Sequence, residues 1–190
     1  LEQLLGNTKE LQESVMRIRM LPISFAFNRF PRLVRDLSNK MNKNINLEMH
    51  GENTELDKTV MEQIGDPLVH LVRNAIDHGI ESEEKRIESG KSAQGTIKLD
   101  AYHQGGSIVI EVSDDGGGIS RDNVFRKAVE KGLIKDSDDL SDTQVYDLIF
   151  EPGFSTAKEV SDISGRGVGM DVVRSNIQSL GGSIQIESEL

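Results

Sequence analysis

Hydrophobic and polar residues follow two different periods along this chain, and the two periods alternate. Spacing of three and four residues predicts helices from near Pro31 to Met41, from Asp57 to Asp77, and over 121–131, 142–149 and 170–180. Strict alternation predicts strands over 45–49, 97–101 and 108–112, and a last strand that carries Ile184 and Ile186 inward. The glycines at 105 and 106 turn the second and third strands into a hairpin. We therefore expect an α/β fold in which helices cover one face of a sheet.

The N-terminal segment carries hydrophobic residues at the spacing of a coiled coil. Leu4, Leu11 and Ile18 repeat every seven residues, with Leu1 and Val15 beside them. The pattern predicts the end of a two-heptad seam that stops before Pro22, or equally a helix that packs on its own domain. Because the chain begins with Leu1 rather than Met, we expect it to be a piece of a longer protein.

Composition narrows the class of protein. With 190 residues, of which 36% are hydrophobic, the chain is long enough for a buried core. Cysteine is absent, which excludes disulfides and thiolate metal sites and fits a reducing cytoplasm. No hydrophobic run reaches membrane-spanning length, and a net charge of −10 argues against nucleic-acid binding. Basic residues nevertheless dominate 17–43, which forms either a docking surface for an acidic partner or an ordinary solvated helix face.

The predicted helix that ends at Gly79 carries polar residues in a stripe. His70, Asn74 and His78 are four residues apart and should share one side of the helix, next to its hydrophobic face. Arg73 and Asp77 form another stripe. An asparagine oxygen is a suitable ligand for Mg²⁺, which uses few protein groups and keeps phosphates and waters as its other ligands. The alternative is that these are ordinary polar residues beside a buried face.

A second candidate lies at the end of the 108–112 strand. Asp114 has the same phase as Ile108, Ile110 and Val112, so its carboxylate should point toward the core side. A carboxylate there needs a donor, and an adenine amino group is a good one. Glycines at 116 and 118 would let the backbone approach a planar base. The alternative is a surface turn rich in Asp and Gly.

Another glycine turn, at 165, 167 and 169, precedes the 170–180 helix. Free N–H groups and the positive end of the helix dipole at such a turn suit a phosphate. The stretch between the two glycine turns, about 119–164, would then be a lid. Lys127 could reach phosphates from it, or could be an ordinary cation on a helix surface.

These segments, in this order, resemble the N, G1, F and G2 boxes of the GHKL ATP-binding superfamily. The residues that carry a closer resemblance, to the bacterial chemotaxis histidine kinases, are His70-Leu71-Val72-Arg73-Asn74-Ala75-Ile76-Asp77-His78-Gly79, Gly153-Phe154-Ser155-Thr156 and Gly165-Arg166-Gly167-Val168-Gly169-Met170-Asp171. The resemblance spans essentially the whole chain. It implies a two-layer α/β sandwich of the GHKL (Bergerat) type, with a mixed sheet covered by helices on one face. Residues 1–22 would be the end of a dimerisation helix and its linker, and 23–190 the kinase domain.

The resemblance also implies a role for each matching residue. Asn74 would hold Mg²⁺, Asp114 would bind the adenine amine, and the catalytic residues would be His70, Arg73 and Asn74. The other ATP contacts would come from His70, His78, Gly116, Gly118, Ile119, Lys127, Ser155, Gly165, Gly167, Val168, Gly169 and Met170.

The activity implied is transfer of the ATP γ-phosphoryl group to a histidine on a separate phosphotransfer domain, from which response regulators take it. A chemoreceptor and a coupling protein would bind other domains, and the full-length protein would be a cytoplasmic homodimer that neither binds nucleic acid nor inserts into membranes. None of the four histidines resembles an exposed acceptor, so we expect no autophosphorylation by this chain alone.

Two other functions stay open from the sequence. One is a GHKL ATPase that hydrolyses ATP to drive a clamp; such enzymes place a glutamate base one turn before the metal-binding asparagine, where this chain has His70. The other is a non-catalytic dimerisation scaffold, which only the short N-terminal seam favours.

Overall fold

The computed structural model describes residues 7–8, 10–12, 19–155 and 169–190. The chain divides into two compact units, Leu1–Asp115 and Gly116–Leu190, and each is described by itself. Most of the predicted N-terminal seam, including Leu4 and Ile18, lies outside the described residues, as do Gly165, Gly167 and Val168.

The first unit contains a small ladder and a mixed sheet. Strands β1 (Met20–Pro22) and β3 (Glu55–Asp57) pair antiparallel. In the sheet, β2 (Ile45–His50) runs parallel to β4 (Gly95–Gln104), and β4 pairs antiparallel with β5 (Ser107–Asp114). The predicted hairpin and the predicted mixed sheet are both confirmed.

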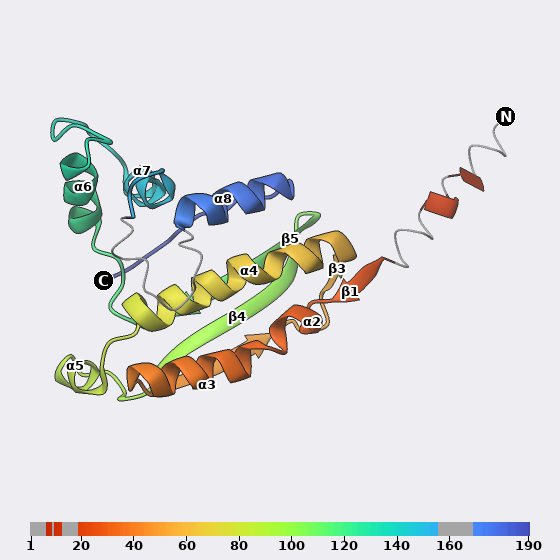
Figure 1. The fold of residues 1–190 in the computed structure, drawn as a ribbon, viewed down its shortest axis with the longest axis horizontal. Coiled ribbons are helices and arrows are strands. Elements are labelled where there is room, and N and C mark those ends of the chain that lie inside the picture. The colour runs from red at the N-terminus through yellow and green to blue at the C-terminus, as the bar shows by residue number, and fades with distance from the viewer. Residues whose placement is uncertain (1–6, 9, 13–18, 156–168) are drawn as a thin grey trace. The chain divides into compact units, whose positions relative to one another are not determined.

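Helices lie against one face of this sheet, as predicted. The helical elements of the unit are α2 (Ser24–Phe27), α3 (Phe30–Met41), α4 (Lys58–Asn74), the π-helical turn η1 (Ala75–Gly79) and α5 (Glu83–Glu88). Helix α3 packs on β2 and α4 on β5, as Figure 1 shows. In β4, Ile97, Leu99 and Ala101 are buried beneath the helices, whereas Lys98 on the opposite face is exposed. Each fully buried Ile or Leu stabilises this layer by about 1.5–3 kcal/mol.

The second unit is helical in its described part. It contains α6 (Arg121–Glu130), α7 (Asp142–Asp147), the 3₁₀ turn η2 (Leu148–Phe150) and α8 (Met170–Ser179). Its core is formed by Val124, Ala128, Val145 and Phe154, which are all buried. Ser141 and Gln144 form a reciprocal capping box that starts α7. The three helices predicted for this part of the chain are confirmed.

One predicted helix differs in the type of its last turn, and one predicted strand is wrong. The predicted helix over 57–77 is α-helical only to Asn74, where the π-helical turn replaces it. The predicted strand at Ile184 and Ile186 is not formed: both residues are half-buried in alternation with exposed neighbours, but residues 182–190 are irregular. A strand needs a hydrogen-bonding partner, and the described residues of the second unit include no other strand. Among the described residues, no helix combines the length and apolar character needed to cross a membrane.

Candidate functional site

The side chain of Asp114 lies on the helix-covered side of the sheet. Its partner in the β4–β5 ladder is Ile97, which is fully buried on that side, and paired residues point the same way. A Cβ atom added to Gly79 would be 3.0 Å from each carboxylate oxygen of Asp114. The predicted phase of Asp114 is therefore confirmed, and the structure brings this carboxylate against the end of the helix that carries Asn74.

The π-helical turn contains the last residue of the predicted polar stripe, His78. The Ile80 N–H donates to the Ala75 carbonyl at 2.8 Å, so this turn holds one residue more than an α-helical turn. His70 and Asn74 share a side of α4, and His78 lies in the π-helical turn that follows. His78 is exposed, with its Nε2 atom 3.5 Å from the Asp77 carboxylate. The shared stripe of these three residues therefore stays a prediction.

Lys43 supports the π-helical turn, a role that sequence reasoning missed. Its ammonium donates to the carbonyls of Ile76 at 2.6 Å and of Asp77 at 2.9 Å. Burial lowers the pKa of Lys43, while the negative charges of Asp77 and Glu81 act in the opposite direction. A basic residue 33 positions before Ile76 gives no signal in the sequence that it will serve this turn.

The predicted catalytic residues on α4 differ in their surroundings. His70 is half-buried; its burial, and then the positive charge of Arg73, lower its pKa, so the imidazole is neutral at pH 7. The Nε atom of Arg73 is buried and finds no hydrogen-bond acceptor among the described residues. A buried N–H donor of a charged guanidinium that has no acceptor among the described residues is suited to bind an anionic ligand. Asn74 is half-buried at the last position of α4.

The donor set for a metal on α4 is small. Within the described ranges no group of three or more His, Asp or Glu side chains could hold a metal ion. Mg²⁺ bound to a nucleotide commonly takes only one or two protein ligands. The single amide oxygen of Asn74 therefore fits Mg²⁺ that keeps phosphates and waters as its other ligands.

The glycines after Asp115 belong to the second unit. Gly118 has φ +71°, and a Cβ there would be 2.2 Å from the Glu189 carbonyl oxygen. Next to it, the Ile119 N–H donates to Ser188 Oγ at 2.8 Å. Only glycine fits position 118, because of its backbone conformation and the close approach of residues 188–189. The predicted contacts of Gly116, Gly118 and Ile119 with a base stay predictions.

Two predicted lid residues lie near one buried aromatic side chain. Phe154 belongs to the core of the second unit, and the Lys127 ammonium lies 5.0 Å from the centre of its ring. Ser155 follows at the surface. Gly169 is the N-cap of α8, and Met170 is buried at the first position of that helix. The predicted site residues thus divide between the two units, with His70, Arg73, Asn74, His78 and Asp114 in the first.

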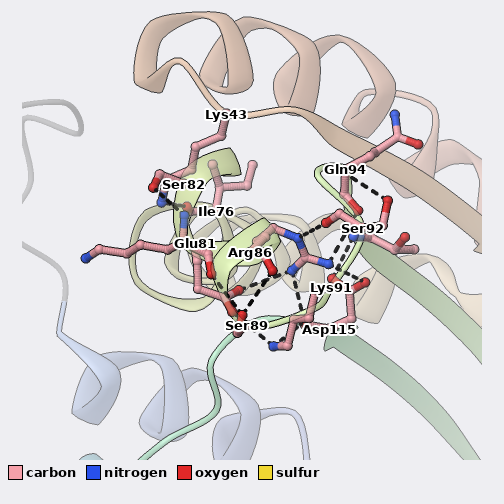
Figure 2. Close-up of polar contacts among 12 residues, drawn as sticks. Lys43, Ile76, Glu81, Ser82, Arg86, Ser89, Lys91, Ser92, Gln94 and Asp115 are labelled. Carbon is pink, nitrogen blue, oxygen red and sulfur yellow. Dashed lines mark hydrogen bonds and ion pairs between the residues drawn. The ribbon is translucent and has the colours of Figure 1, made fainter.

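A buried arginine that sequence reasoning also missed lies at the end of β5 (Figure 2). Arg86 on α5 is 1% exposed. Its Nε donates to the Ser92 carbonyl at 2.7 Å, and its Nη2 donates to the Gln94 carbonyl at 3.4 Å and to the Asp115 carboxylate at 3.0 Å. Its Nη1 donates to the Glu81 carboxylate and to the Asp115 carbonyl, both at 3.1 Å. All five N–H donors of the guanidinium are used.

Lys91 joins the same network. Its ammonium donates to Glu81 Oε2 at 3.0 Å and to the Asp115 carbonyl at 3.2 Å. Burial alone would raise the pKa of Glu81, but hydrogen bonds from the backbone and from Lys91, with the charges of Lys91 and Arg86, leave that pKa below its usual value. The network ties α5 and residues 91–95 to the end of β5.

Comparison with known proteins identifies the family to which this chain belongs. The sequence model of the family described as histidine kinase-, DNA gyrase B-, and HSP90-like ATPase matches residues 63–190. The chain belongs to this ATPase family, and the resemblance to the GHKL superfamily is confirmed.

Within this family the chain is similar to chemotaxis proteins. It is 54% identical over 187 residues to chemotaxis protein CheA of Salmonella typhimurium, covering 98% of this chain and 28% of that protein. It is 52% identical to CheA of Bacillus subtilis, covering 94% and 27%, and 52% identical to sensor histidine kinase CheAY of Helicobacter pylori, covering 96% and 23%. A solved histidine kinase domain from the blue-light activated histidine kinase of Erythrobacter litoralis EL346 matches with a TM-score of 0.46 at 14% identity, over 89% of this chain and 56% of that one. The chain spans about a quarter of the length of these curated relatives.

Proposed function

We propose that this chain is the ATP-binding catalytic domain of a chemotaxis histidine kinase. Membership of the ATPase family implies ATP binding. The observation that carries the proposal further is the Asp114 carboxylate, which lies against Gly79 at the end of the helix that bears Asn74. Similarity to CheA proteins over nearly the whole chain favours a kinase over other members of this family.

In the proposed site Asp114 accepts a hydrogen bond from the adenine amine, and this contact sets the orientation of the base. Asn74 holds Mg²⁺ through its amide oxygen. The buried Nε of Arg73, which has no acceptor among the described residues, donates to the triphosphate. Bound Mg²⁺ supplies neutralisation of the charge on the β and γ phosphates. His70, uncharged at pH 7, can donate its single ring N–H to a phosphate oxygen without adding charge. The remaining residues that we propose to contact ATP belong to the second unit: Gly116, Gly118, Ile119, Lys127, Ser155, Gly165, Gly167, Val168, Gly169 and Met170.

The proposed reaction is an in-line displacement at the γ phosphorus. The lone pair of an acceptor imidazole forms the new N–P bond, and the bond from the γ phosphorus to the β,γ-bridging oxygen breaks with its electrons on ADP. The chain contributes positioning and charge complementarity to this step rather than a covalent intermediate. The acceptor is a histidine on a separate phosphotransfer domain, from which response regulators take the phosphoryl group.

The curated relatives are about four times as long as this chain, so they contain other domains. We infer that the whole protein contains such domains too. Residues 1–22 would then be the end of a dimerisation helix and linker, and 23–190 the kinase domain with its lid at about 119–164. The partners would be a second copy of the full-length protein, a chemoreceptor and a coupling protein, all in the cytoplasm.

The test is phosphoryl transfer between two separately made proteins. The chain is mixed with Mg²⁺, γ-labelled ATP and a phosphotransfer domain, and the expected product is acid-labile phosphohistidine on that domain. Asn74→Ala should abolish labelling, whereas Asn39→Ala, an exposed position on α3, should not change it. Release of free phosphate at an appreciable rate without labelled protein would contradict the kinase proposal and favour the clamp-type ATPase.

A further inference from the structure

The two adjacent aspartates at the end of β5 have different surroundings. Asp114 lies on the helix-covered side, against Gly79. Asp115 is held by the sheet and by the arginine network: its Oδ1 accepts from the Thr96 N–H at 2.8 Å, and its own N–H donates to the Thr96 carbonyl at 3.2 Å. Arg86 binds its Oδ2 and its carbonyl oxygen. Asp115 is therefore fixed by polar contacts at its amide, its carbonyl and its carboxylate.

Arg86 has the properties of a positioning residue rather than of a ligand contact. It is fully buried, and each of its donors already has an acceptor within the first unit. Three of those acceptors are backbone carbonyls, and two of these lie in the loop at 92–94. The planar guanidinium group, whose donors point in fixed directions, therefore holds three segments of the chain rigidly together. One of these segments contains Asp115, which directly follows Asp114 in the chain. Asp114 and Asp115 are joined by one peptide unit, so a shift of Asp115 would also move the Asp114 carboxylate. Because a hydrogen bond weakens steeply when its geometry is lost, such a shift would weaken the proposed bond from Asp114 to a ligand.

We propose that Arg86, acting through Asp115, positions the Asp114 carboxylate and thereby sets the preference of the site for adenine over 6-oxopurines. The inference rests on the proposed function, because it requires Asp114 to bind the 6-amino group. A carboxylate accepts from the amine of ATP but faces a carbonyl oxygen in inosine triphosphate. The ratio of the two dissociation constants thus reports the placement of Asp114 separately from the overall fold and from binding of the triphosphate.

The experiment measures dissociation constants of the chain for Mg²⁺-ATP and Mg²⁺-ITP by calorimetry. We expect the unmodified chain to prefer ATP by about ten- to hundredfold, the range for one charge-assisted hydrogen bond. Arg86→Lys keeps the positive charge of the side chain but removes the planar guanidinium group. Asp115→Asn keeps the size of the side chain but removes its negative charge and therefore the ion pair with Arg86. Both variants should bind ATP about tenfold more weakly, with ITP affinity little changed, so the preference falls. Arg32→Lys, whose side chain is 83% exposed, is the matched control and should keep the preference.

The outcomes separate this inference from the proposed function. If the unmodified chain binds neither nucleotide or does not prefer ATP, the adenine contact of the proposed function fails and the inference fails with it. If it prefers ATP but both folded variants keep that preference, or lose both nucleotides equally, the positioning role is overturned and the proposed function stands. Circular dichroism establishes that each variant folds. If Arg86→Lys does not fold, the Asp115→Asn variant alone tests the positioning role. The Asp115 side chain is 48% exposed, and its substitution leaves the guanidinium of Arg86 in place.

Discussion

Replacing Arg86 with methionine should lower the free energy of unfolding by about 3 kcal/mol. Methionine has a similar length but no donors, so Glu81 and Asp115 lose an ion-pair partner and the carbonyls of Ser92 and Gln94 lose a donor. Removing one partner of a buried ion pair costs about 3–5 kcal/mol. We expect the lower end of that range because Lys91 still binds Glu81 at 3.0 Å, and because the Asp115 side chain is 48% exposed.

The assay is urea unfolding followed by far-ultraviolet circular dichroism, since the chain has no tryptophan to report folding by fluorescence. The control is Arg32→Met, which removes an exposed ion pair with Asp36 at 3.7 Å. Such a pair contributes about 0–1 kcal/mol, so the control should unfold almost like the unmodified chain. The slope of the transition should be unchanged if both variants stay compact. Equal destabilisation by the two substitutions would refute the conclusion that the buried network holds α5 to the sheet.

Three further predictions concern the proposed site. Asp114→Asn should abolish detectable ATP binding by calorimetry while the unfolding curve stays the same; unchanged affinity would remove Asp114 from the adenine contact. Gly79→Ala should weaken ATP binding, because its new Cβ would lie 3.0 Å from the Asp114 carboxylate oxygens and would displace them, whereas Gly90→Ala, at an open surface position, should leave affinity unchanged even if it lowers stability through its φ of +79°. His70→Gln should reduce the loss of stability on acidification. The pKa of His70 is lower in the folded state, so between the folded value and about 6.5 the unfolded chain binds more protons and stability falls as the pH falls. Melting temperatures at pH 7.5 and about pH 5.5 measure this effect, and an identical decrease in the variant would count against it.

Local periodicity was sufficient for most elements of the fold. The alternation of Ile97, Leu99 and Ala101 predicted a strand with one buried face, and those three residues are buried in β4. Alternation also predicted the side of the sheet on which Asp114 lies, because a strand that stays regular to its end keeps its phase. These features depend on neighbouring residues of one strand, and so a single sequence contains them.

Features that depend on distant residues were not predictable in this way. The change from α-helix to π-helical turn after Asn74 is accompanied by two hydrogen bonds from Lys43, which is more than 30 positions away. The predicted strand at Ile184 kept its alternating burial but formed no ladder, because a strand also needs a partner. Arg86 stood in a charged segment, Glu83-Glu84-Lys85-Arg86, which is typical of a solvated helix. Only the fold shows that this arginine is buried while Glu83, Glu84 and Lys85 remain exposed.

The pair Asp114-Asp115 shows how one fold gives identical neighbours different surroundings. Asp114 is the last residue of β5 and faces the helix side of the sheet, so a ligand on that side meets the first aspartate. The second aspartate, Asp115, is held by Arg86 and by the backbone of Thr96, so its side chain has a structural role. Fixing the residue next to Asp114 reduces the conformational freedom of this segment, and such preorganisation generally favours affinity over a flexible turn with the same residues. The Asp-Gly-rich segment that could have been an ordinary surface turn is therefore anchored, immediately after Asp114, by a fully buried guanidinium.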